Sequence, residues 1–579
     1  MSFTATDWVF LLATLVIPLV IAILCYRRAG QNLSEYFLSG RDLPWWLSGT
    51  SMVATTFAAD TPLVVTGMVA ASGISGNWLW WNAGLGGMLT VFFFAHLWRR
   101  AGITTDAEFA ELRYTGKPAV FLRGFRALYL GLPINCLIIG WVNLALAKVL
   151  SVTLGWERIT AVFIGLLTTG IYASLSGLRG VILSDLVQFG LALIGTVALA
   201  YFALQIPTVG GLTGLMEQLP PAAFQFTPTF TLTSSDNTLA LSLSAFIAFL
   251  GVQWWASWYP GQEPGGGGYL AQRMMSTKNE QHSQSATLWF VLAHYCLRPW
   301  PWIIVALVST VLYPRLSDPE SGYALIMRDY LPTGWLGLLI GVFFAAYMST
   351  VSTQLNWGTS YLVNDVYARF LRPNANQIEL VRASRLTTVA IMVISGGVTF
   401  FLENVRQAWE FVLESGAGVG LVLILRWYWW RINAISEIVA LLAAALGCVG
   451  LRLLTSISFP DSLLYLVPWT TFCWVTATWL TPAEPMSHLI NFYRRVQPNG
   501  PGWQPIELRL GHAHPSGGIG HLALNWVAGC VLLYSVLFGV GNLLFGSTLQ
   551  VCMSAILATA AISWLRFGPG RCWPRALRS

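Results

Sequence analysis

The feature that most constrains this chain is a succession of apolar stretches, each long enough to cross a lipid bilayer. A hydrocarbon core of about 30 Å takes about 20 residues of helix. Lipid offers no hydrogen bonds to exposed backbone, so spanning segments of this length must be helical. The sequence therefore predicts an all-α integral membrane protein of about fifteen transmembrane helices. The expected spans are 7–25, 45–70, 76–97, 122–152, 157–175, 180–205, 238–258, 284–313, 334–365, 382–402, 407–429, 433–455, 463–481, 521–546 and 549–567.

The low charge content supports this class. Charged residues make up 10% of the 579 residues and hydrophobic residues 55%, whereas soluble domains carry about 25% charged residues. The net charge of +7 comes from short basic links between apolar runs, so we expect contact with the lipid bilayer and no nucleic-acid partner. The eight cysteines are scattered singly and predict neither a disulfide framework nor a metal site.

Basic residues are distributed unevenly between alternate links. The links 206–237, 455–462 and 545–549 contain none. The positive-inside rule therefore predicts a multi-pass protein of the inner cell membrane, with its N-terminus outside and its C-terminus cytoplasmic. The basic residues of the predicted cytoplasmic links include Arg27, Arg28, Arg41, Arg99, Arg100, Arg113, Lys117, Arg369, Arg372, Arg382, Arg385, Arg494, Arg495 and Arg509.

Two predicted spans contain helix-breaking residues. The second holds Ala54-Thr-Thr-Phe57-Ala-Ala-Asp60-Thr61-Pro62. Pro62 has no backbone N–H and disturbs the preceding turn, which frees carbonyls near Ala58. A bound cation satisfies such carbonyls in broken membrane helices, although a simple kink satisfied by the threonine hydroxyls is an equal alternative. In the eleventh span, the glycine-rich run 415–420 would either break the helix or allow close helix packing.

The ninth span carries a polar face. Ala346, Ser349, Thr350 and Thr353 are spaced i, i+3, i+4 and i+7, which aligns three hydroxyl groups on one side of an apolar helix. Neutral oxygen atoms suit a hard cation. Hydrogen bonding between neighbouring helices would explain the same pattern.

Charged residues within spans need partners, because burying one at the bilayer centre costs about 2.5–3.5 kcal/mol. Asp185, in the sixth span, would bind a cation or pair with Arg179. Arg298, in the eighth, would bind a substrate carboxylate or pair with Asp60 or Glu414.

Four motifs in order resemble those of the sodium:solute symporter family, to which proline, sugar and sialic-acid symporters belong. The similarity runs from about residue 7 to residue 455, and 487–503 is similar to the tail linker of one bacterial branch. The motifs are Ser34-Glu-Tyr-Phe-Leu-Ser-Gly-Arg41, Gly177-Leu-Arg-Gly with Ser184-Asp185-Leu-Val-Gln188, Tyr269-Leu-Ala-Gln-Arg273, and Ala346-Tyr-Met-Ser-Thr350 through Asp365.

The resemblance implies the leucine-transporter fold, in which two inverted five-helix repeats place binding sites at the membrane midplane between broken helices. The symporter core would be 1–455, with a peripheral helix at 7–25, repeat one at 45–205 and repeat two at 238–429. Residues 456–579 would form a C-terminal extension with a cytoplasmic linker, 482–520, and three membrane helices. The sequence itself shows no convincing internal repeat.

The resemblance also implies where sodium binds. The family's common site combines two carbonyls of the first core helix with one carbonyl and two hydroxyls of the eighth. A second site in some members uses an aspartate of the fifth core helix and two further hydroxyls. The first set corresponds here to Ala54, Phe57, Ala346, Ser349 and Thr350, and the possible second set to Asp185, Ser352 and Thr353.

Substrate positions transfer less directly, because this chain inserts 258–268 after the sixth core helix. Ala58 and Phe411 replace polar residues of the sugar carriers, so a sugar is not favoured. Arg298 favours an organic or amino acid. The implied substrate-binding residues are Ala58, Thr61, Asn135, Trp254, Tyr295, Arg298, Phe411 and Glu414.

We therefore expect a sodium-coupled symporter that imports a small polar solute and is not an enzyme. The sequence contains no phosphate-binding loop for ATP. A proton-coupled or uncoupled carrier on the same fold is the first alternative, with Asp185 or Glu414 as its proton site. A membrane-embedded enzyme is the second, with His512 and His514, or Asp106 and Glu108, as its site.

Overall fold

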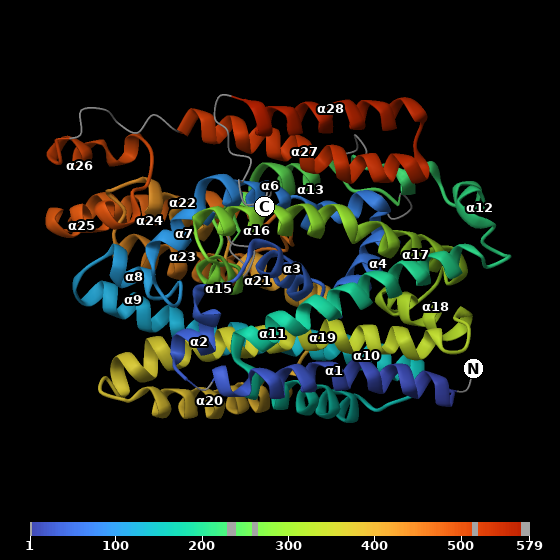
Figure 1. The fold of residues 1–579 in the computed structure, drawn as a ribbon. Helices are drawn as coiled ribbons and strands as arrows, with labels where there is room; N and C mark the ends of the chain where they lie inside the picture. Colours follow the sequence, from blue (N-terminus) through green and yellow to red (C-terminus); the bar gives the residue numbers. More distant parts are fainter. Residues whose placement is uncertain (1–2, 30, 229–238, 258–263, 512–518, 569–579) are drawn as a thin grey trace.

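A computed structural model describes residues 3–29, 31–228, 239–257, 264–511 and 519–568. The described residues form helices and loops without a β-strand, and the long helices run side by side across the view in Figure 1. The predicted all-α class is confirmed. The histidine pair at 512 and 514, part of the insertion 258–268 and the end of the chain lie outside the described residues.

The N-terminal half contains two very long helices and several short ones. Its α-helices are α1 (Ala5–Ala29), α2 (Leu33–Leu38), α3 (Trp45–Thr56), α4 (Thr61–Ser72), α5 (Trp78–Trp81), α6 (Ala83–Leu89), α7 (Ala95–Ala101), α8 (Phe109–Arg113), α9 (Gly116–Tyr129), α10 (Asn135–Leu154), α11 (Arg158–Leu204) and α12 (Gly211–Gln218).

The C-terminal half continues the bundle and adds a helical hairpin. Its α-helices are α13 (Leu243–Ile247), α14 (Trp254–Ala256), α15 (Gly268–Ser276), α16 (Glu280–Leu292), α17 (Pro299–Leu312), α18 (Gly322–Tyr330), α19 (Trp335–Ser360), α20 (Gln377–Thr399), α21 (Val405–Ser415), α22 (Val419–Tyr428), α23 (Ala434–Leu454), α24 (Leu463–Leu480), α25 (Met486–Val496), α26 (Gln504–Arg509), α27 (Ile519–Phe545) and α28 (Thr548–Phe567).

Short turns of tighter or wider helix connect many of these elements. They are η1 (Ser39–Arg41), η2 (Ile74–Asn77), η3 (Thr90–Phe94), η4 (Leu130–Ile134), η5 (Pro221–Phe224), η6 (Ala248–Gln253), η7 (Ala293–Leu297), η8 (Pro319–Ser321), η9 (Tyr361–Leu371) and η10 (Pro501–Trp503).

Fewer spans are single long helices than the sequence predicts. Nine helices of the described chain are long and apolar enough to cross a membrane, and eleven if each of two bent pairs counts as one span. The predicted span 76–97 is a chain of short elements from η2 to α7. The predicted spans 157–175 and 180–205 join into α11, which Gly177 interrupts with a φ of 56° that favours glycine. The predicted number of fifteen helices therefore stays a prediction.

Both predicted helix breaks are present. α3 and α4 meet at an angle of 56°, with Pro62 in the first turn of α4, where its missing N–H costs nothing. α21 and α22 meet at 51°, and Gly418 at the start of α22 has a φ of 87°. The glycine run therefore breaks the helix, as one of its two interpretations predicted.

The centre of the bundle is held by α19, which packs against α1, α11 and α10. The Asp7 carboxylate of α1 accepts hydrogen bonds from the backbone N–H groups of Gly334 (2.9 Å) and Gly337 (2.8 Å) at the start of α19. The N–H groups at a helix N-terminus have no partner within the helix and attract negative charge. The contact fixes the position of α19 along the bundle, and α19 carries much of the polar site described below.

Candidate functional site

The break between α3 and α4 lies directly against the polar face of α19. The Thr350 hydroxyl donates to the Thr55 carbonyl (2.7 Å) and to the Ala346 carbonyl in its own helix (3.2 Å). Thr55 and Thr353 share a hydrogen bond of 3.1 Å. The two helices that the sequence singled out are therefore adjacent, and their oxygen atoms face each other.

The end of α3 keeps some of its helical bonds. The Phe57 N–H donates to the carbonyls of Val53 (2.9 Å) and Ala54 (3.0 Å), and the Thr61 N–H donates to the Ala58 carbonyl (3.3 Å). The break is consequently a compact turn of backbone, and one of its carbonyls, that of Thr55, lies against a hydroxyl of α19. This is the chemistry, neutral oxygen atoms from two segments, that a hard cation requires.

A second polar cluster surrounds Asp185 of α11, which is fully buried. Its carboxylate accepts from Ser51 (2.5 Å) and Ser349 (2.6 Å), and the Arg273 guanidinium lies 3.8 Å away. Arg273 also donates to Thr353 (2.7 Å). The cluster thus connects α3, α11, α15 and α19, and the buried acid has its cation within the chain.

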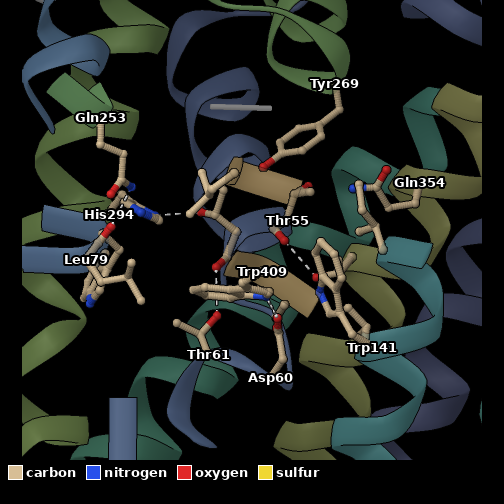
Figure 2. Close-up of a pocket in the computed structure, with 17 residues that line it drawn as sticks. Thr55, Asp60, Thr61, Leu79, Trp141, Gln253, Tyr269, His294, Gln354 and Trp409 are labelled. Atoms are coloured by element: carbon tan, nitrogen blue, oxygen red, sulfur yellow. Dashed lines mark hydrogen bonds between the residues drawn. The ribbon is translucent and has the colours of Figure 1, made fainter. Parts of the chain in front are cut away.

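A cavity of about 70 Å³, the volume open to the centre of a water molecule, adjoins the α3–α4 break. This is roughly five times the volume that one water needs. Figure 2 shows Gln253 and His294 on one side, Gln354 and Trp141 on the other, and Asp60 with Trp409 between them. The cavity is lined by Thr55, Thr56, Ala58, Asp60, Thr61, Leu79, Trp80, Ile138, Trp141, Val142, Gln253, Tyr269, His294, Thr350, Gln354, Trp409 and Leu413. Thr55 and Thr350 belong both to the cavity and to the contact between α3 and α19.

Comparison with known proteins agrees with this geometry. A model described as the sodium:solute symporter family matches residues 36–444. The chain belongs to the sodium:solute symporter family. Its homologues are secondary transporters, so this family member is a transporter and not an enzyme.

Individual relatives are distant. This symporter-family protein is 22% identical over 465 residues to a sodium/glucose cotransporter of Vibrio parahaemolyticus, covering 76% of this chain and 83% of that one. It is 24% identical over 478 residues to sodium/glucose cotransporter 1 of Sus scrofa, covering 75% and 70%. The substrate-bound, outward-open structure of a Na+-coupled sialic acid symporter is similar with a TM-score of 0.68 at 18% identity, covering 84% of this chain and all of that one. The shared architecture is the leucine-transporter-like fold that the motifs predicted.

Of the eight predicted substrate residues, only Ala58 and Thr61 are among the described residues that line the cavity. Tyr295 stacks behind the lining residue Trp80, with ring centroids 5.7 Å apart, and Trp254 stacks on Trp526 at 5.6 Å. Asn135 donates to the Gln354 carbonyl (2.9 Å). These three side chains support the cavity wall or pack elsewhere.

The three remaining predicted residues are also not among the described residues that line the cavity. Arg298 contacts the His294 ring and the Val53 carbonyl (3.3 Å), and lies over the Phe57 and Trp302 rings. Glu414 pairs with Arg452, which also covers the Phe411 ring. The suggested ion pairs of Arg298 with Asp60 or Glu414 do not form, and Arg179 pairs with Asp42 (3.2 Å) instead of Asp185.

Several lining residues escaped the sequence reasoning. Tyr269 and Gln354 lie within the motifs that resemble the symporter family. Gln354 and His294 are polar residues in the middle of predicted spans, which is itself an indication of a functional site. Trp409 and Gln253 carry no such signal, because a tryptophan or glutamine near a helix end is ordinary in a membrane protein. Only the packing of α21 and η6 shows that their polar atoms reach the cavity.

Proposed function

We propose that this protein uses the sodium gradient to import a small polar solute, with sodium bound by Ala54, Phe57, Ala346, Ser349 and Thr350. The observation that carries the proposal is the hydrogen bond of 2.7 Å from Thr350 of α19 to the Thr55 carbonyl at the end of α3. It brings the two predicted ligand segments together beside the cavity.

The mechanism follows from this arrangement. An ion between the α3 break and α19 would hold the two helices together and favour the state that binds solute from outside. Inward movement of one sodium ion down a membrane potential supplies about 2.3 kcal/mol per 100 mV. Occupation of the cavity and of the ion site would be coupled, because Thr350 is a proposed sodium ligand and also lines the cavity.

The proposed orientation has the N-terminus outside. In Figure 1, α8, α9, α25 and α26 lie at the end of the bundle opposite the N-terminus. Ion pairs gather in this region, including Arg123 with Glu111 (2.5 Å) and with Asp365 (2.7 Å). Basic residues at this end support a cytoplasmic location for it.

The test measures sodium dependence directly. The full chain, in detergent, should have a higher unfolding temperature in sodium chloride than in potassium chloride of equal strength, because a bound ion stabilises the folded state. The double variant Ser349→Ala with Thr350→Ala should lose most of this difference. Thr559→Ala is the matched control, since Thr559 makes the same local hydrogen bond to a carbonyl four residues earlier, on the exposed helix α28.

An unchanged sodium effect in the double variant would show that the ion binds elsewhere. Uptake into proteoliposomes separates the proton-coupled alternative. Transport that continues without sodium and stops with a protonophore would replace the sodium proposal.

A second sodium ion at Asp185, Ser352 and Thr353 is a further proposal. Arg273 already stands beside Asp185 and donates to Thr353, so a second ion would have to displace this guanidinium. Two coupled ions should give a sigmoidal dependence of uptake on sodium concentration. A hyperbolic dependence would indicate that the first site alone is used.

A further inference from the structure

The cavity contains a buried carboxylate that forms no ion pair with a described residue. Asp60, at the break between α3 and α4, is 2% exposed. Its Oδ2 accepts from the Trp409 indole N–H (3.0 Å), whereas its Oδ1 has no hydrogen-bond donor. No described lysine or arginine forms an ion pair with it, and Asp60 is the single Asp, Glu, Lys or Arg among the described lining residues. A buried charge is costly unless it is paired.

The surrounding polar atoms are mostly acceptors. Oε1 of Gln253 and Oε1 of Gln354 also lack a donor, and the amide orientation of Gln253 is fixed because its Nε2 donates to the Leu79 carbonyl (3.0 Å). Two of the threonine hydroxyls are already used: Thr56 donates to the Val53 carbonyl (2.9 Å) and Thr350 to the Thr55 carbonyl (2.7 Å), whereas the Tyr269 phenol also lines the cavity and can donate or accept. The cavity therefore has unsatisfied acceptors on several sides, and a ligand that donates hydrogen bonds would complement them.

Aromatic side chains form much of the remaining wall. Trp80, Trp141, Tyr269 and Trp409 all line the cavity, and Figure 2 shows Trp409 against Asp60 with Trp141 beside them. Aromatic rings attract organic cations through their negative faces. A sodium ion, by contrast, requires several oxygen ligands, which the indole rings do not provide.

Arg298 forms no direct ion pair with Asp60 and acts on this carboxylate only through attraction at longer range. Its guanidinium contacts His294 and the Val53 carbonyl and is sandwiched near the Phe57 and Trp302 rings. The terminal torsion of an aspartate is soft, so a small rotation presents the free oxygen of Asp60 to the cavity.

We propose that Asp60 and the tryptophans around it bind a positively charged nitrogen of the transported solute, the ammonium of an amine or amino acid. The inference rests on the proposed transport function, because it assigns the solute's charge at the same cavity. A purely anionic solute would place like charge against Asp60, and a neutral sugar would leave the carboxylate without its cation.

The experiment uses matched pairs of small molecules on the full chain, in sodium and in potassium chloride. L-Alanine is compared with L-lactate, in which a hydroxyl replaces the ammonium, and choline with 3,3-dimethylbutan-1-ol, its neutral counterpart. Glucose and succinate represent the sugar and acid classes. The amine of at least one pair should raise the unfolding temperature in sodium, and its counterpart should not.

Asp60→Asn keeps the size of the side chain and removes its charge. The apparent affinity for the amine should fall roughly 10- to 100-fold, the usual effect of losing a charged hydrogen bond. Glu217→Gln is the control, because Glu217 is an exposed acid on α12 far along the chain from the cavity residues. Without solute, the Asp60→Asn protein should be at least as stable as the wild type, since an unpaired buried charge has been removed.

Three binding results would overturn the inference: neither L-alanine nor choline stabilises the protein, a counterpart binds as tightly as its cation, or Asp60→Asn leaves the affinity for the cation unchanged. A lower stability of solute-free Asp60→Asn would also overturn it, because Asp60 would then already have a partner. Failure of the transport proposal looks different. Amine binding that is equal in sodium and potassium would reject sodium coupling while supporting the Asp60 site. Binding of lactate or glucose in sodium alone would support sodium coupling while rejecting the Asp60 site.

Discussion

Removing one partner of the ion pair between Asp185 and Arg273 should destabilise the centre of the bundle strongly. Both side chains are fully buried, and the closest carboxylate oxygen lies 3.8 Å from the guanidinium. Asp185→Asn removes the carboxylate charge and leaves Arg273 with only neutral partners, Ser51 (3.2 Å), Gln272 (3.2 Å) and Thr353 (2.7 Å). Breaking a buried pair in this way costs about 3–5 kcal/mol of the free energy of unfolding.

The double variant Asp185→Asn with Arg273→Gln separates the pair energy from the cost of leaving one charge unpaired. Because it removes both charges, its loss should be smaller than the sum of the two single losses by about 0.5–3 kcal/mol. The four free energies come from denaturant unfolding of the full chain in detergent. Asp42→Asn is the control, since Asp42 forms an exposed pair with Arg179 at 3.2 Å, and such pairs contribute about 0–1 kcal/mol.

Two results would refute this reasoning. If Asp185→Asn cost no more than Asp42→Asn, the buried pair would not contribute as the geometry indicates. If the single losses were additive in the double variant, Asp185 and Arg273 would not interact energetically.

Two further predictions concern the helix break and the ion pairs outside the membrane. Gly418→Ala should cost about 1–3 kcal/mol of the free energy of unfolding, because φ is +87° and a Cβ would lie 2.5 Å from Thr470; an equal cost for Gly397→Ala, which has open space, would contradict this. Burial raises the pKa of Glu111 in α8. Hydrogen bonds from Arg369 and Arg123 lower this pKa by more than burial raises it, so the pKa lies below its ordinary value. Glu111 therefore stabilises the folded protein at a pH above its ordinary pKa of about 4.5. This contribution is lost as the pH falls through the lower pKa of the folded protein. The unfolding temperature of Glu111→Gln should change less over this acidic range, and parallel pH profiles would argue against the pair.

Residues with a local effect on the backbone were predictable from sequence. Pro62 interrupts hydrogen bonding within its own turn, and a glycine such as Gly418 permits a left-handed backbone, so the sequence marks both positions as candidate breaks, with close helix packing as the alternative at the glycine run. The hydroxyl face of α19 follows from helical spacing, and its position beside Thr55 agrees with the arrangement implied by family resemblance.

Residues whose effect depends on neighbours could not be placed from the sequence. Arg298 was expected to bind solute because a guanidinium in mid-span is costly, yet rings of Phe57 and Trp302 and the Val53 carbonyl accommodate it inside the protein. Glu414 found Arg452 on α23, a partner that nothing in the local sequence indicates. The free-energy cost of burying a charged side chain identifies a residue that needs a partner, but it does not identify the partner.

The sequence by itself determined that the chain is a helical membrane protein, at which two positions a helix break was to be expected, and which oxygen-rich segments could bind an ion. These properties depend on the length, hydropathy and backbone restrictions of contiguous residues. Only the tertiary structure decided that Asp60 and Trp409 meet at a cavity while Arg298 does not reach it. The rotation of each helix about its axis is set by packing against its neighbours, and that rotation decides which polar side chains face the solute.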